Sequence, residues 1–199
     1  VGRRYPIIVQ EGKKRGWEFI AHSFTENDLL VNFANDFEKE RELIRRSIKG
    51  FEEVMGSRPK GWLSPSMSPT LNTVKILVDE GMKFFCDYVN DDQPYPISVD
   101  GRMLISIPYT AEINDYPLFL RQFYTSDEIF GIVKEYFDVL YEEGRESAKI
   151  MNIGLHPHVI GQPYRIKTLE RILEHITRHK QVWFPKRIDI AEWYLEKYT

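Results

Sequence analysis

Ile-Gly-Leu-His-Pro-His, residues 153–158, is the stretch that decides the fold of this chain. It follows an apolar run, Lys149–Ile153, which predicts a buried strand. A strand that stops at Leu155 places the imidazole of His156 at its carboxyl end. In α/β folds this end carries the ligand-binding loops, because rigid strands hold loops that are free to vary. A hydrogen-bonded histidine in a turn would give the same local pattern. Whether His156 belongs to a functional site therefore depends on the other motifs of the chain.

Strands and helices alternate along the chain. Short apolar strands are predicted at 17–21, 61–65, 82–86, 150–155 and 182–184, with a hairpin at 97–107 turned by Asp100-Gly101. Amphipathic helices are predicted at 5–16, 35–55, 68–81, 126–141, 165–179 and 188–198. This alternation favours parallel strands joined by right-handed crossovers, in an open sheet or a barrel. We predict an α/β fold and a single domain over residues 1–199. A complete barrel takes about 250 residues, so we expect its N-terminal portion to be missing here.

The composition is that of a soluble globular protein, with 42% hydrophobic and 29% charged residues and a net charge of -3. Lys and Arg are scattered, which argues against a nucleic-acid partner. No apolar run reaches the roughly 18 residues that span a bilayer, and no signal peptide is visible, so we expect no membrane partner. Cys86 is the single cysteine, which rules out an internal disulfide and fits a reducing compartment. We therefore expect a cytoplasmic protein, although the absence of an initiator Met leaves a lost targeting segment open.

Polar and ionisable residues gather just after the predicted strands. In a parallel α/β fold these positions converge on one face of the molecule. Histidines and carboxylates that share a cleft suit hydrolysis, because one group activates water and another protonates the leaving group. These positions are His22, Glu26 and the segments 62–65, 87–92, 109–115 and 156–158. The candidate site residues among them are His22, Glu26, Trp62, Ser64, Asp92, Tyr109, Glu112, Asp115 and His156.

Several of these residues have a simpler structural interpretation. His22 and Glu26 are four apart, so a helical turn would let them bind one divalent metal together, but Glu26 could equally cap the next segment. Asp115 fits an Asx turn as well as a ligand-binding site. His175 and His179 are four apart on a charged helix, and we interpret them as solvated.

The order and spacing of these motifs resemble the polysaccharide deacetylase (NodB-homology) superfamily, above all the branch that includes the cofactor-independent allantoinases. The resemblance implies a distorted (β/α) barrel with its site at the carboxyl ends of the strands. It also implies hydrolysis of a carbon-nitrogen bond, in either an N-acetylated sugar or a cyclic amide derived from purines. The similar segments are Arg4–Pro6, Gly16–His22, Arg58–Trp62, Asp91–Tyr95, Ile107–Tyr109, Glu112–Asp115, Ile153–His156 and Gly161–Pro163.

The resemblance also implies roles for particular residues. His156 is expected to protonate the leaving nitrogen, and His22 to bind a metal or orient the substrate. The remaining residues of the set are expected to bind substrate: Trp62, Ser64, Asp92, Tyr109, Glu112 and Asp115.

Two features depart from the family pattern. Glu26 stands where metal-dependent members have a second histidine, so we expect either no metal or one divalent ion, zinc before others, on His22 and Glu26. Residues 1–21 contain no match to the aspartate pair that supplies the family's general base. Either that segment lies outside this chain or the base comes from elsewhere.

Two functions from different classes remain. The first is a hydrolase of non-peptide carbon-nitrogen bonds that acts on a small or sugar-derived amide. The alternative is a non-catalytic, ligand-binding remnant of the same fold. In either case we expect a homo-oligomer, since the unpaired edge of an incomplete sheet tends to associate with another chain.

Overall fold

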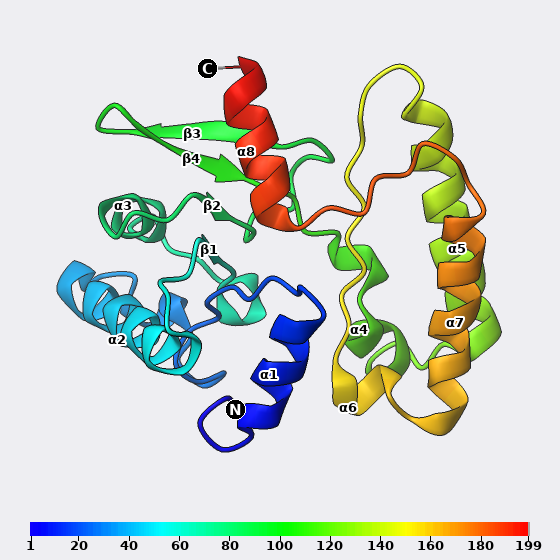
Figure 1. Cartoon of the computed structure of the whole chain (residues 1–199), viewed down its shortest axis with the longest axis horizontal. Helices are drawn as coiled ribbons and strands as arrows, with labels where there is room; N and C mark the ends of the chain where they lie inside the picture. The colour runs from blue at the N-terminus through cyan, green and yellow to red at the C-terminus, as the bar shows by residue number, and fades with distance from the viewer. Residues whose placement is uncertain (199) are drawn as a thin grey trace. The chain divides into compact units, whose positions relative to one another are not determined.

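The computed structural model describes residues 1–198 of the chain (Figure 1). It is a mixed α/β structure with a four-stranded sheet, and the predicted α/β class is confirmed. The chain divides into two compact units, which we describe one at a time. Unit 1 comprises Val1–Tyr88, Pro94–Ile107 and the residues from Pro185 onward, and unit 2 comprises Val89–Gln93 and Pro108–Phe184.

The sheet of unit 1 has the order β1-β2-β4-β3. Strands β1 (Gly61–Trp62), β2 (Phe84–Phe85) and β4 (Arg102–Ser106) are parallel, and β3 (Tyr95–Val99) pairs with β4 as an antiparallel hairpin. Asp100 and Gly101 turn the hairpin with φ values of 50° and 74°. A two-residue turn of this kind needs positive φ at both positions, which explains the Asp-Gly pair.

The helices of unit 1 are α1 (Pro6–Lys14), α2 (Phe37–Met55), α3 (Thr73–Asp79) and α8 (Arg187–Tyr198), with 3-10 turns η1 (Leu30–Phe33) and η2 (Pro65–Met67). Helix α2 begins at Asp36, whose side chain accepts from the backbone N–H of Lys39, and ends at Gly56 with φ of 72°. Both ends follow the usual capping chemistry, and the predicted helix is confirmed. Ile44 and Ile48 of α2 are fully buried in the core of this unit.

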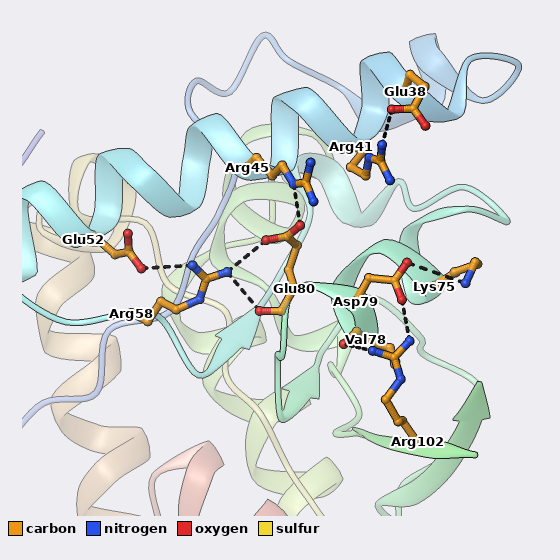
Figure 2. A network of polar contacts seen from close by, with 10 residues as sticks. All are labelled: Glu38, Arg41, Arg45, Glu52, Arg58, Lys75, Val78, Asp79, Glu80 and Arg102. Carbon is orange, nitrogen blue, oxygen red and sulfur yellow. Dashed lines mark hydrogen bonds and ion pairs between the residues drawn. The ribbon is translucent and has the colours of Figure 1, made fainter. Parts of the chain in front are cut away.

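Arg58 joins α2 to the end of α3 (Figure 2). Its guanidinium donates to Glu52 Oε1 at 3.1 Å, and to both the backbone oxygen and Oε2 of Glu80 at 3.0 Å. Arg45 of α2 donates to the other carboxylate oxygen of Glu80 at 2.6 Å. Only 11% of the Glu80 side chain is exposed. The segment that enters β1 is therefore anchored to two helices by one arginine, which gives Arg58 a structural role.

Helix α8 begins on a carboxylate from the other end of the chain. Glu18 Oε2 accepts from the backbone N–H of Arg187 at 2.8 Å, and Glu18 Oε1 accepts from that of Ile188 at 3.2 Å. Burial raises the pKa of Glu18, and these hydrogen bonds oppose the rise. The first N–H groups of a helix have no partner within it, so Glu18 satisfies two of them.

Unit 2 is mainly helical. Its elements are η3 (Ala111–Ile113), α4 (Asp115–Leu120), α5 (Ser126–Glu143), α6 (Pro157–Ile160) and α7 (Pro163–Thr177). Thr125 and Glu128 form a capping box at the start of α5, where each side chain bonds the backbone of the other residue. Apolar residues of α5 and α7, such as Val133 and Ile172, share one core. Along residues 1–198, no helix combines the length and the apolar character that crossing a bilayer requires.

The predicted strand at 150–155 is wrong. Only Gly154 pairs there, in a single parallel bridge with Asn114. The apolar residues before it are half-buried, and the backbone N–H of Ile150 donates to the carbonyl of Asp92, in a loop, at 2.8 Å. A strand forms only where a neighbouring strand takes up its hydrogen bonds, and here a loop takes them up instead.

Two other predicted strands differ in the same way. Of residues 17–21, only Ala21 pairs, in a parallel bridge with Trp62. Residues 182–184 form no strand in the described structure, and Trp183 and Phe184 are largely exposed. Apolar composition alone predicted these strands, and it does not specify a pairing partner.

Candidate active site

The carboxylate of Asp115 holds His156 at two points in unit 2. Asp115 Oδ2 accepts from the backbone N–H of His156 at 2.8 Å, and Oδ1 lies 2.6 Å from the ring Nδ1. The Asp115 side chain is 3% exposed, whereas that of His156 is 40% exposed. An ionised carboxylate can only accept, so the ring proton sits on Nδ1. The lone pair of the neutral ring is therefore on Nε2, and the ring orientation is fixed.

A close approach between two backbone segments builds this pair. Gly154 and Asn114 form a parallel bridge, and the N–H of Asp115 donates to the carbonyl of Gly154 at 2.9 Å. The bridge brings Asp115 beside His156, two residues beyond the glycine. A Cβ atom at position 154 would lie 2.2 Å from Tyr109 Oη and 2.8 Å from Asn114 Nδ2. Glycine is therefore needed here for space rather than for an unusual φ value.

Short helices and an aromatic ring surround the dyad. Asn114 caps α4 by accepting from the N–H of Tyr116 at 2.9 Å. His156 precedes α6, whose first residue is Pro157. The Tyr116 ring lies 5.5 Å from the His156 ring and 6.4 Å from the His158 ring, centroid to centroid. The half-exposed imidazole of His156 thus has an aromatic neighbour.

Three predicted substrate-binding residues, Asp92, Tyr109 and Glu112, line one cavity of about 420 Å³ in unit 2. Burial raises the pKa of Tyr136, which also lines it, and the charges of Glu112 and Asp92 add to the rise. Tyr109 Oη accepts from Asn114 Nδ2 at 2.9 Å. This hydrogen bond links the cavity wall to the residue that precedes Asp115.

Asp92 is not a free carboxylate. Lys149 Nζ lies 2.9 Å from Asp92 Oδ2, and this hydrogen bond raises the pKa of the lysine. A carboxylate that is already paired with an ammonium group is a weaker partner for a cationic ligand. The polar wall of the cavity is therefore better suited to hydroxyl and amide groups than to a cation.

His22 belongs to unit 1 and follows the bridge residue Ala21. Its Nδ1 lies 2.6 Å from the carbonyl oxygen of Leu63, and its Nε2 lies 3.0 Å from Glu26 Oε1. Because a carbonyl only accepts, Nδ1 carries a proton and donates it to Leu63. The structure therefore brings His22 and Glu26 together, which the spacing of four residues suggested.

The His22–Glu26 pair alone does not fit a catalytic zinc ion. It offers one imidazole nitrogen and one carboxylate, and a catalytic zinc takes three protein ligands. Among residues 1–198, the one group of three or more His, Cys, Asp or Glu residues whose ligand atoms all lie within 4.8 Å of one another is Asp138, His175 and His179. The His22–Glu26 pair is therefore one protein ligand short of a catalytic zinc site.

Trp62 and Ser64 are fully buried in unit 1 and bond a carboxylate that was not among the predicted site residues. Trp62 Nε1 donates to Ser64 Oγ at 2.9 Å, and the Oγ and the backbone N–H of Ser64 each donate to Asp87 at 2.6 Å. Burial raises the pKa of Asp87 to about 6, while the bonds from Ser64 and the charge of His22 oppose the rise. The burial of Trp62 and Ser64 does not support direct contact with substrate. Asp87 lies two residues after β2, inside the polar segment 87–92 that follows a predicted strand.

Comparisons with known proteins extend these observations. No family model matches the chain. A Schizosaccharomyces pombe protein described as "Putative polysaccharide deacetylase" is 34% identical over 207 residues, which cover 94% of this chain and 63% of that protein. The crystal structure of Puue Allantoinase is 33% identical with a TM-score of 0.89, and a Pseudomonas aeruginosa PAO1 structure described as "probable Polysaccharide deacetylase" is 32% identical with the same score.

Both structural matches cover 99% of this chain and 65% of the solved chain. The chain thus spans slightly less than two thirds of the length of these relatives. Its fold class, an α/β fold of the polysaccharide deacetylase type, is confirmed by this similarity. Together with the sequence match, these results show that nearly the whole chain is similar to proteins of the polysaccharide deacetylase superfamily.

Proposed function

We propose that the protein hydrolyses a non-peptide carbon-nitrogen bond, either by removing an N-acetyl group from a sugar or by opening a cyclic amide. The observation that carries this proposal is the pair formed by Asp115 and His156. A buried carboxylate fixes the tautomer of a half-exposed imidazole and leaves Nε2 available. The names of the related proteins, an allantoinase and polysaccharide deacetylases, support the same bond type.

In this reaction water adds to the carbonyl carbon, a tetrahedral oxyanion forms, and the carbon-nitrogen bond breaks as the nitrogen takes a proton. Nε2 of His156 first takes the proton that the attacking water loses, and then passes it to the leaving nitrogen. While the ring is protonated, the carboxylate of Asp115 stabilises its positive charge. We therefore assign Asp115 as a positioning residue for His156 rather than a ligand of the substrate.

We propose that the cavity lined by Asp92, Tyr109 and Glu112 binds the substrate. Its volume of about 420 Å³ lies in the lower part of the usual range for small-molecule pockets. Its polar wall suits a compact ligand rich in hydroxyl or amide groups. A sugar unit and a cyclic ureide both have this character.

A first experiment assays the natural full-length protein with N-acetylglucosamine oligomers and with allantoin. His156→Ala should lower kcat by about 10² to 10⁴, the usual contribution of a proton-transfer group. His158→Ala is the matched control, because this exposed histidine lies two residues from His156, in α6, and should change kcat by only a few-fold. Unchanged turnover in His156→Ala would reject the assigned role.

Assays of the same full-length protein distinguish the two classes of function and test whether a metal takes part. Ligand binding without turnover would favour the alternative, a non-catalytic binding domain. A chelator should leave activity unchanged if no metal takes part. Loss of activity that zinc restores would instead assign one divalent ion to the site.

We also propose that the protein acts in the cytoplasm as a homo-oligomer. The scattered charges and the single, buried Cys86 support a reducing compartment, and β1 and β3 lie at the two ends of the strand order. Light scattering of the natural protein and fractionation of its cells test the two statements separately.

A further inference from the structure

Two histidines and a carboxylate gather on α5 and around the C-terminal end of α7, on elements other than those that hold Asp115 and His156. Asp138 comes from α5, His175 from the last turn of α7, and His179 from the residues after that helix. One ligand atom from each lies within 4.8 Å of the other two, and all three residues are half-buried. We propose that Asp138, His175 and His179 bind a divalent transition-metal ion, and that zinc fits this site best.

The second nitrogen of one histidine is already held as in many metal sites. His179 Nδ1 lies 2.9 Å from the backbone oxygen of His175. A carbonyl only accepts, so Nδ1 carries the proton and the lone pair of the neutral ring is on Nε2. Metal-bound histidines usually donate their other N–H to a carbonyl or carboxylate in this way. The ring of His179 is therefore set to present Nε2 as a ligand.

The other two ligands share a contact that a metal ion would replace. His175 Nε2 lies 2.6 Å from Asp138 Oδ1. Metal binding releases the proton of such a contact, because the ion takes both lone pairs. A metal ion at this point would therefore bind the imidazole and the carboxylate that now bond each other directly.

Aromatic packing fixes both imidazole rings. The Phe137 ring lies 5.6 Å from the His175 ring and 4.9 Å from the His179 ring, and the Tyr141 ring lies 4.8 Å from that of His179. The side chain of His175 is only 20% exposed. The interpretation of these histidines as solvated is therefore wrong. Ligands held by packing lose little further entropy when they bind an ion.

The donor set selects the kind of metal. Two imidazole nitrogens and one carboxylate oxygen, with water completing a tetrahedron, suit zinc and its neighbours, whereas calcium and magnesium prefer oxygen ligands alone. Zinc bonds of this kind place ligand atoms ~3.3 Å apart. Distances between 2.6 Å and 4.8 Å here need only small side-chain movements.

One charge opposes the ion. Lys134 Nζ lies 2.5 Å from Asp138 Oδ2, the carboxylate oxygen that does not face His175. A simpler role for the three residues would be an ion pair near the end of α7, where a protonated histidine is favourable. Removal of Lys134 distinguishes the two possibilities. It should raise the affinity of the three residues for a cation if they bind a metal. If they form only an ion pair, they should still bind no metal after Lys134 is removed.

Equilibrium dialysis of the natural full-length protein against Zn²⁺ alone, followed by metal analysis, tests the proposal. We expect one equivalent of zinc whose affinity falls by more than about 100-fold in both His175→Gln and His179→Gln, since loss of an outer partner alone costs 10- to 100-fold. His158→Gln should leave this affinity unchanged, and Lys134→Ala should raise it several-fold. Zinc at 100 times its Kd should also raise Tm by about 5 to 10 °C.

The opposite results would overturn the proposal. Zinc binding that is absent, or that survives both His175→Gln and His179→Gln, would show that these residues form only an ion pair. If His22→Gln removes zinc binding instead, the ion belongs to the His22–Glu26 pair. If the histidine variants fail to fold, Lys134→Ala still decides, because unchanged zinc affinity in this variant would contradict a cation beside Asp138.

Discussion

Asp115 and His156 are 41 residues apart in the sequence, yet one carboxylate bonds both the backbone N–H and the ring of the histidine. The two contacts use different oxygens of Asp115 and fix both the position and the tautomer of His156. A carboxylate can do this because each of its oxygens accepts. An amide offers only one accepting oxygen, so an asparagine at position 115 could not accept both hydrogen bonds.

Asp115→Asn should lower kcat by about 10² or more while the protein stays folded. If the amide oxygen faces the backbone N–H, its NH₂ group faces Nδ1 of His156 and forces the proton onto Nε2. In the reverse orientation, the NH₂ group opposes the backbone N–H. Steady-state kinetics between pH 5 and 9 would measure the loss, together with a changed pH profile.

Asp127→Asn is a suitable control for this experiment. Asp127 also pairs with one basic residue, Arg171, but its side chain is 86% exposed and lies at the start of α5. The kcat of Asp127→Asn should stay within a few-fold of the wild-type value. An Asp115→Asn enzyme with a normal kcat and a normal pH profile would reject the positioning role.

Gly154 should not tolerate a side chain. A Cβ atom there would lie 2.2 Å from Tyr109 Oη, so Gly154→Ala should lower the free energy of unfolding by about 1 to 3 kcal/mol. Urea denaturation would measure it. Tyr109→Phe removes the oxygen that clashes, so the double variant should lose less than the sum of the two single variants. Strict additivity would contradict this account, since Asn114 Nδ2 would then be the contact that matters.

The amphipathic helices could be predicted because their signals are local. Asp36 and Gly56 mark the ends of α2, and Thr125 with Glu128 marks the start of α5. The apolar run at 150–155 has no comparable local signal for its partner. Whether such a run pairs as a strand depends on residues distant in sequence, and here it pairs only at Gly154.

The candidate site shows the same limit. His156 and Asp115 were each singled out by their position after a predicted strand, but their contact depends on the bridge between Gly154 and Asn114. No spacing in the sequence encodes that bridge. Asp87 was missed as a site residue because its partner, Ser64, lies 23 residues away and both are buried.

Asp87 should make stability depend on pH. Its folded pKa is raised by burial from 3.8 to about 6, so the folded state binds more protons than the unfolded state between these values. The stabilisation is complete below pH 3.8 and is lost as pH rises through about 6. Asp87→Asn mimics the neutral form, so relative to the wild type it should gain about 2 kcal/mol between pH 4.5 and pH 7. Urea denaturation at both pH values gives this difference, and an equal effect at both would contradict the raised pKa.

Arg58 should contribute more to stability than an ordinary surface arginine. It donates to Glu52 and, twice, to Glu80, whose carboxylate is mostly buried. Arg58→Ala removes all three bonds and leaves that carboxylate with Arg45 alone. We expect a loss of about 1 to 2 kcal/mol, less than three full charged hydrogen bonds, because the Arg58 side chain is itself half exposed.

The geometry of the guanidinium should matter as well as its charge. A lysine at position 58 is a single point donor that cannot reach acceptors in three directions, so Arg58→Lys should recover less than half of the loss. Arg145→Ala is the matched control, because Arg145 makes one exposed pair with Glu142 and should change stability by at most about 0.5 kcal/mol. Urea denaturation with an unchanged m-value measures all three variants. Full recovery by lysine would mean that a positive charge near Glu80 is sufficient, and that the three-way contact adds nothing.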